Sequence, residues 1–140
     1  MSAPCTSACP AHIQIPEFID EIRTKRFLPA LSIIREHMPL PGLCGRVCPH
    51  PCEAVCRRGE VDEPINIMNL KQSAWNYEYF RNQVQNIPEK KAPTGKTCAV
   101  IGAGPAGLSA AYYLALMGHQ VEVFDKMQEP GGMTAAGIPD

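Results

Sequence analysis

Apolar side chains in the first part of the chain recur at the spacing of short amphipathic helices. One predicted helix has Pro16 in its first turn, and its apolar stripe is formed by Phe18, Ile19 and Ile22. A second helix is predicted to start near Pro29 and to end before Pro39. It would bury Leu31 and Ile34. These segments indicate a mainly α-helical N-terminal domain.

Two more helices are predicted further along the chain. A short one has Pro51 in its first turn and would place Cys52 and Cys56, four residues apart, on the same side. A longer one covers residues 66–81, where apolar side chains again recur at helical spacing. The following residues carry prolines and charges without an apolar period. We therefore place the helical domain at residues 1–85 and a linker at residues 86–96.

The pattern changes after the linker. Thr97–Ile101 is predicted to be a buried strand, Pro105–Met117 a helix and Gln120–Phe124 a second strand, which gives one β-α-β unit within residues 97–140. No charged side chain occurs from Thr97 to Gly118, a length that could suggest a membrane span. Glycines and a proline divide that stretch into strand, turn and helix, so we predict no membrane span.

The overall composition limits the class of protein. The chain has 140 residues and a formal net charge of −1, so it has no basic excess and we expect no nucleic-acid partner. Its seven cysteines are an odd number, and the N-terminus lacks the features of a secretory signal. Both observations argue against a secreted disulfide scaffold, and we expect a reducing, cytoplasmic location.

Six of the seven cysteines fall in two short clusters that share a C-x3-C-P pattern: Cys5, Cys9, Cys44, Cys48, Cys52 and Cys56. Bacterial ferredoxins end their cluster-binding run of cysteines in the same way, so an iron–sulfur centre is predicted. The alternative is structural zinc, which usually takes C-x2-C pairs that this chain lacks. If a cluster is present, the nearby charges of Arg46, Arg57 and Arg58 favour its reduced state.

A glycine fingerprint follows the first predicted strand directly. Gly102 permits a tight turn, Gly104 lets the backbone approach a pyrophosphate, and Gly107 lets the helix pack on the strand. The helix N-terminus, including Ala103, Pro105 and Ala106, would face the phosphates. Asp125 ends the second strand, where a carboxylate can bind a ribose hydroxyl. These features predict FAD or NAD, although Lys126 leaves room for a 2′-phosphate.

Taken together, these motifs resemble the N-terminal iron–sulfur domain of the glutamate synthase small subunit family, which includes the matching part of dihydropyrimidine dehydrogenase. The resemblance rests on Cys9-Pro10, Cys44–Pro49, Cys52, Cys56 and Pro64–Ile67, followed by Val100–Leu108, Phe124–Lys126 and Gly131–Met133. It implies a helical ferredoxin-like domain followed by the start of an FAD-binding domain. Gly132 would then belong to the FAD site.

The resemblance also implies roles for the cysteines. Cys9, Cys48 and Cys52 would ligate one cluster, Cys5 and Cys56 match ligands of another, and Cys44 matches a cysteine that need not be a ligand. Two-cluster members have a C-x2-C pair before the position of Cys5, and some members have a Gln or Glu ligand where this chain has Lys71. We therefore expect one [4Fe-4S] cluster, with its fourth thiolate drawn from Cys56, Cys5 or Cys44.

The family continues beyond the length of this chain, so we expect either a fragment of a longer flavoprotein or a subunit completed by another chain. The predicted function is electron transfer between FAD and the cluster and onward to a partner, within an NAD(P)H-dependent oxidoreductase. The isolated chain is not expected to oxidise NAD(P)H. The alternative function is a zinc-binding or metal-free helical docking module for a catalytic partner, and thiol–disulfide redox chemistry is a third.

Overall fold

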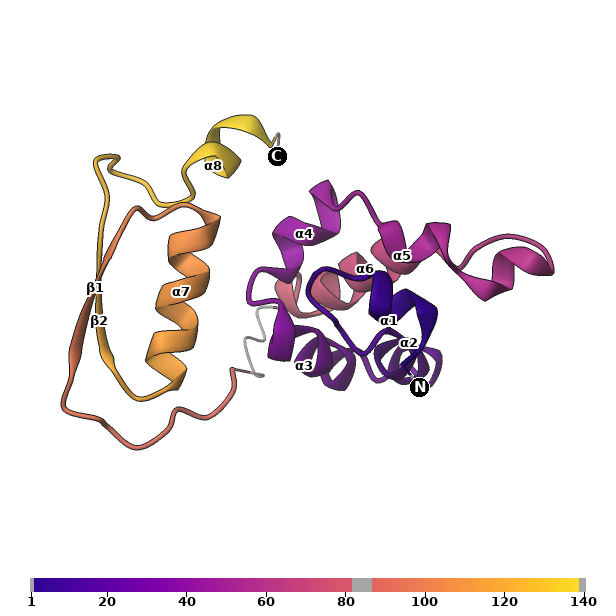
Figure 1. Cartoon of the computed structure of the whole chain (residues 1–140), viewed down its shortest axis with the longest axis horizontal. Coiled ribbons are helices and arrows are strands. Elements are labelled where there is room, and N and C mark those ends of the chain that lie inside the picture. The colour runs from indigo at the N-terminus through magenta and orange to yellow at the C-terminus, as the bar shows by residue number, and fades with distance from the viewer. Residues whose placement is uncertain (1, 82–86, 139–140) are drawn as a thin grey trace. The chain divides into compact units, whose positions relative to one another are not determined.

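A computed structural model describes residues 2–81 and 87–138. The chain divides into two compact units, with the division between Ile87 and Pro88 (Figure 1). Residues 85 and 86, at the predicted domain end and linker start, lie outside the described residues, as do residues 139 and 140. The predicted domain boundaries therefore stay predictions.

The first unit consists of short helices. Their bounds are Pro4–Ala8 (α1), Ile15–Arg23 (α2), Phe27–His37 (α3), Pro41–Val47 (α4), Pro51–Ala54 (α5) and Ile67–Tyr79 (α6), with a 3-10 turn at Arg57–Glu60 (η1). The core lies where α2, α3 and α6 pack together, and its largest fully buried side chains are Ile13, Phe18, Leu31 and Ile34. Burial of such side chains is the main force that holds short helices together.

Helix α4 lies unusually close to α6 because glycines occupy the contact. A Cβ atom added at Gly42 would collide with the Trp75 ring, and one added at Gly45 would collide with the Gln72 side chain. The two glycines are three residues apart and share one face of α4. The opposite face, which carries Cys44, is left to line a cavity in the helical unit.

A buried ion pair joins α3 to α6. The Arg35 guanidinium donates to both carboxylate oxygens of Glu78, and the Nη1–Oε1 distance is 2.8 Å. The N-terminus of α6 is held by Glu53 of α5, whose Oε1 accepts from the Met68 amide at 2.8 Å. These contacts fix α6 against its neighbours at both ends.

The second unit is a β-α-β unit followed by a short helix. Strand β1 (Thr97–Ile101) pairs in parallel with β2 (Gln120–Phe124), in a register that sets Thr97 opposite Gln120. Helix α7 (Pro105–Leu116) connects the strands and packs along them, and α8 (Met133–Gly137) follows (Figure 1). Residues 88–96 belong to this unit, since Lys91 and Thr94 donate to the carbonyls of Leu116 and Gly118.

The predicted fold class is confirmed: a mainly α-helical unit precedes the beginning of a Rossmann-like fold. Helix α3 starts two residues before Pro29, and neither α1 nor α4 was predicted. Among the helices that the structure describes, none combines the length and the hydrophobicity that crossing a membrane requires.

Candidate metal centre and nucleotide site

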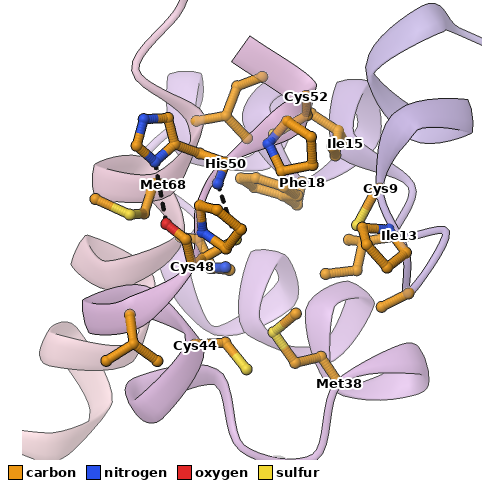
Figure 2. A pocket seen from close by; sticks show the side chains of 17 residues that line it. Cys9, Ile13, Ile15, Phe18, Met38, Cys44, Cys48, His50, Cys52 and Met68 are labelled. Carbon is orange, nitrogen blue, oxygen red and sulfur yellow. Dashed lines mark hydrogen bonds between the residues drawn. The ribbon is translucent and has the colours of Figure 1, made fainter. Parts of the chain in front are cut away.

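Four of the six clustered cysteines line one cavity of about 280 Å³ in the helical unit. They are Cys9, Cys44, Cys48 and Cys52. Figure 2 shows the sulfur atoms of Cys9 and Cys44 directed toward the open space from different sides. The rest of the wall is mostly apolar and includes Ile13, Ile15, Phe18, Met38, Ile67 and Met68.

Each thiol reaches the cavity from a different local structure. Cys9 is the C-cap of α1, which is tied to α2 by a hydrogen bond from the Ile15 amide to Thr6 Oγ1 at 3.3 Å. Cys44 lies on α4, Cys48 is the C-cap of that helix, and Cys52 lies on α5. Prolines after Cys9 and Cys48 turn the chain away from each helix end.

His50 holds the segment between α4 and α5 in a left-handed conformation, with φ of +42°. Its amide donates to Cys48 Sγ at 3.3 Å, and its Nδ1 lies 3.0 Å from the Cys48 carbonyl oxygen (Figure 2). Non-glycine residues in this region are uncommon and often occur at functional sites. The amide points a donor at the sulfur, where it would stabilise a thiolate.

Burial raises the pKa of two of these thiols. The pKa of Cys52 is raised to about 11 by burial and by the neighbouring Cys9, Glu53 and Cys48. Burial also raises the pKa of Cys44, and the positive charge of Lys71 partly offsets this effect. Both thiols therefore stay protonated at neutral pH, and binding of iron would have to displace their protons.

The remaining two cysteines of the clusters lie elsewhere. Cys5 and Cys56 line a second cavity of about 280 Å³, together with Ile15, Ile19 and Ile65. The prediction that Cys52 and Cys56 share one side of a helix was wrong. Helix α5 ends at Ala54, so Cys56 instead precedes the 3-10 turn η1.

The four-thiol cavity suits a group larger than one ion. Among the described residues, no three His, Cys, Asp or Glu side chains converge closely enough to hold a single metal ion. The cavity of about 280 Å³ far exceeds the roughly 10–15 Å³ that one water molecule needs. Thiolates are the ligands of iron–sulfur clusters, and an apolar wall that excludes water is one of the features that tune them.

The glycine loop of the second unit has the geometry expected of a phosphate site. Gly102 has φ of +99°, which favours glycine. A Cβ atom added at Gly107 would collide with the Gly102 carbonyl oxygen, so α7 can approach β1 only with glycine there. A Cβ atom at Gly104 would meet no atom within 4 Å, which leaves open space beside the first turn of α7.

Asp125 supports this loop in a way that the sequence did not indicate. Its Oδ2 accepts from the Ala103 amide at 2.5 Å, and its Oδ1 accepts from the Met127 amide at 2.8 Å. Hydrogen bonds from the amides of Met127, Ala103 and Lys126 lower the pKa of the carboxyl, that of Met127 most strongly, and the positive charge of Lys126 adds to the effect. An ionised carboxylate has about four acceptor sites, so acceptor capacity remains for a ribose hydroxyl.

A hollow of about 880 Å³ brings Asp125, Lys126 and Gly132 together at the end of β2. Gly132 also approaches the glycine loop, since a Cβ atom added there would lie 3.1 Å from Gly104 Cα. The Gly131 amide donates to the Ala103 carbonyl at 2.8 Å. Of the other predicted residues, Ala103 is buried, Pro105 begins α7, and Ala106 is exposed.

Comparison with known proteins gives a family match for each of the two units. The sequence pattern of the family described as dihydropyrimidine dehydrogenase domain II, 4Fe-4S cluster, matches residues 1–83. The chain belongs to this family. Residues 100–137 match the NAD(P)-binding Rossmann-like domain. The predicted family resemblance is therefore confirmed, and the iron–sulfur class of the helical domain with it.

The curated proteins to which this chain is similar bear the names of oxidoreductase subunits or chains. The chain is 51% identical over 140 residues to the NADPH-Fe(3+) oxidoreductase subunit beta of Geobacter sulfurreducens, covering 99% of this chain and 21% of the relative. It is 43% identical over 159 residues to the NADP(+)-dependent formate dehydrogenase subunit beta of Moorella thermoacetica, covering 99% and 22%. It is 37% identical over 136 residues to the glutamate synthase [NADPH] small chain of Mycobacterium tuberculosis, covering 97% and 28%.

The chain thus spans between 21% and 28% of the length of these three relatives. The family match supports an iron–sulfur domain, as predicted. The docking-module alternative is not favoured. A dinucleotide site in the second unit is likewise supported, whereas its assignment to FAD is not decided by these matches.

Proposed function

We propose that this chain is the electron-transfer part of an NAD(P)H-dependent iron–sulfur flavoprotein. The observation that carries the proposal is the single cavity lined by Cys9, Cys44, Cys48 and Cys52, in a chain that also has a complete glycine fingerprint. A [4Fe-4S] cluster held there would supply one-electron transfer, and a bound flavin would accept the hydride of NAD(P)H. The protein supplies the ligands, an apolar wall and the donor from His50.

Cys44 is proposed as the fourth ligand because it shares the cavity with the three thiols that the family resemblance selects. Cys5 and Cys56 line the other cavity, so neither is placed to complete the same set. The groups that influence the pKa of each thiol support the same grouping. Cys48 and Cys9 both act on the pKa of Cys44 and on that of Cys52.

FAD is the proposed dinucleotide, on the strength of the family resemblance. The pyrophosphate would lie over the open space at Gly104 and the N-terminus of α7. Asp125 would bind the ribose, and Lys126 and Gly132 would line the hollow beside it. The full set of proposed contacts is Gly102, Ala103, Gly104, Pro105, Ala106, Gly107, Asp125, Lys126 and Gly132.

The proposed partners are the remaining flavoprotein domains or a separate redox subunit, which would receive the electrons. Three of the relatives bear names of subunits or chains, which suits a protein that passes electrons to another polypeptide. The proposed location is the cytoplasm, where reducing conditions keep clustered thiols available for iron.

The test uses the full-length protein purified without oxygen. We expect a brown preparation with iron, inorganic sulfide and FAD, whose cluster gives an EPR signal after addition of NADH or NADPH. A colourless protein with stoichiometric zinc, and no sulfide after anaerobic reconstitution, would refute the proposal and favour the docking module. A protein whose redox activity survives removal of all metal would indicate thiol–disulfide chemistry instead.

A further inference from the structure

Lys71 is a buried basic residue in the wall of the four-thiol cavity. It lies on α6, its relative exposure is 5%, and it lines the cavity together with Ile67 and Met68 of the same helix. Its charge is close enough to Cys44 to act on that thiol. Lysine is almost never fully buried unless it is paired.

The carboxylates carried by α5 and α6 are engaged with other groups. Glu78 of α6 binds Arg35, and Glu53 accepts from the Met68 amide and lies 3.9 Å from His50 Nε2. Of the ion pairs formed within residues 2–81 and 87–138, none includes Lys71. A buried positive charge without a carboxylate partner costs free energy unless another anion compensates it.

The arginines that the sequence places near the cysteines do not line this cavity. The Arg46 guanidinium lies over the Trp75 ring, 5.5 Å from its centroid, and Arg58 pairs with Asp62 on the exposed 3-10 turn. Of the described basic side chains other than histidine, Lys71 is the one found in the cavity wall. Its charge is therefore the one that a group bound by the four thiols would feel most strongly.

We infer that Lys71 is the counter-charge of the thiolate-bound cluster and raises its reduction potential. The inference rests on the proposed function, because it concerns the same cavity. A cluster with four thiolate ligands is anionic, and reduction by one electron adds a further negative charge. A cation fixed at the wall stabilises the reduced form more than the oxidised form, so the potential rises. Lys71 would therefore affect the reduction potential of the cluster and would not contact a substrate.

This role also predicts a coupling between Lys71 and occupancy of the cavity. Without the cluster, the charge of Lys71 is buried in a mostly apolar cavity wall with no carboxylate partner, and it destabilises the apoprotein. With the cluster bound, the same charge is compensated. A neutral side chain of similar length should therefore stabilise the apoprotein but not the loaded protein.

The experiment compares three variants of the full-length protein. Lys71→Met removes the charge and keeps the length, Lys71→Arg keeps the charge, and Lys25→Met removes an exposed lysine of the same unit as a matched control. The reduction potential is measured by EPR-monitored titration, with iron and sulfide content as the check on loading. Lys71→Met should lower the equilibrium constant for cluster reduction about tenfold or more, a shift of about 59 mV for one electron. Lys71→Arg and Lys25→Met should stay near the wild-type potential.

Several outcomes decide the inference. A loaded Lys71→Met protein with the wild-type potential would overturn it, even though the proposed function stands.

If Lys71→Met does not retain the cluster, Lys71→Leu serves as a second uncharged variant. Loss of the cluster in both, with retention in Lys71→Arg, supports the counter-charge role. Loss in Lys71→Arg as well shows that the residue is structural and overturns the inference. A wild-type protein that binds no iron refutes the proposed function itself.

The thermal unfolding of the apoprotein gives an independent readout. Lys71→Met should raise the Tm of the apoprotein relative to wild type, whereas Lys25→Met should leave it unchanged. A Tm that falls in Lys71→Met apoprotein would show that the lysine packs favourably without any anion, which would contradict the counter-charge role.

Discussion

At the scale of single residues, the structure divides six cysteines that are alike in sequence between two cavities. Spacing alone could not do this, because Cys44 and Cys56 both lie in C-x3-C pairs. The difference arises from packing. The glycine face of helix α4 packs against α6, so Cys44 on the other face lines the cavity. Helix α5 ends at Ala54, and Cys56 lies outside the cavity.

Removal of one thiol tests this division. Cys44→Ala should remove most of the iron and sulfide of the cluster held by Cys9, Cys48 and Cys52, because a cluster iron would lose its protein ligand. Cys98→Ala, in strand β1 of the other unit, is the matched control and should keep full iron content. Iron and sulfide analysis with EPR decides the matter. An unaltered EPR signal in Cys44→Ala would contradict the assignment of this thiol.

Substitution of two glycines of the fingerprint should affect protein stability in one case and cofactor binding in the other. Gly107→Ala places a methyl group against the Gly102 carbonyl and near Val100, and overpacking of this kind costs about 1–3 kcal/mol. Gly104→Ala meets no neighbour, so its effect on stability should stay within about 0.5 kcal/mol. Its methyl group instead enters the space proposed for the pyrophosphate, and flavin content should fall.

Denaturant unfolding and flavin content of the full-length protein measure the two effects. Equal stabilities of the two variants would contradict the close packing of α7 on β1. Full flavin content in Gly104→Ala would argue against a dinucleotide at this loop.

At the scale of helices and strands, most elements followed from the sequence pattern. Helix α2, helix α7 and both strands occur where proline, glycine and apolar spacing predicted them. Helices α1 and α4 were missed because they are short, and because α4 carries two glycines that lower helix propensity. Those glycines are explained only by the close contact with α6. The family resemblance indicated that Lys71 lies near the cysteines, but its burial depends on helix packing.

The packing of α3 on α6 can be tested through its ion pair. Glu78 is 3% exposed and its carboxylate binds Arg35, so Glu78→Ala would leave a buried guanidinium without a partner. We expect a loss of about 3–5 kcal/mol in the free energy of unfolding. The double variant Arg35→Met, Glu78→Leu removes both charges and should recover much of this loss. Unfolding by denaturant measures both variants. An unchanged stability in Glu78→Ala would show that the pair contributes little.

At the scale of the whole molecule, the described residues of each candidate site come from one unit. The four thiols and Lys71 belong to the unit that ends at Ile87, and the glycine loop, Asp125 and Gly132 belong to the unit that begins at Pro88. No residue described at one site contributes to the other. The two cofactors should therefore load independently, although electron transfer requires both.

If the two sites load independently, a substitution at one site should remove only the cofactor of that site from the full-length protein. Cys48→Ala should abolish the cluster, because it removes both a ligand and the acceptor of the His50 amide, and it should leave flavin content at the wild-type level. Gly104→Ala should lower flavin content and leave iron and sulfide unchanged, since no cluster ligand lies in its unit. Iron, sulfide and flavin analysis of the two variants, prepared side by side, measures the effects. Loss of flavin in Cys48→Ala would mean that the helical unit must be loaded before the nucleotide unit can bind, and the two sites would then form one cooperative assembly.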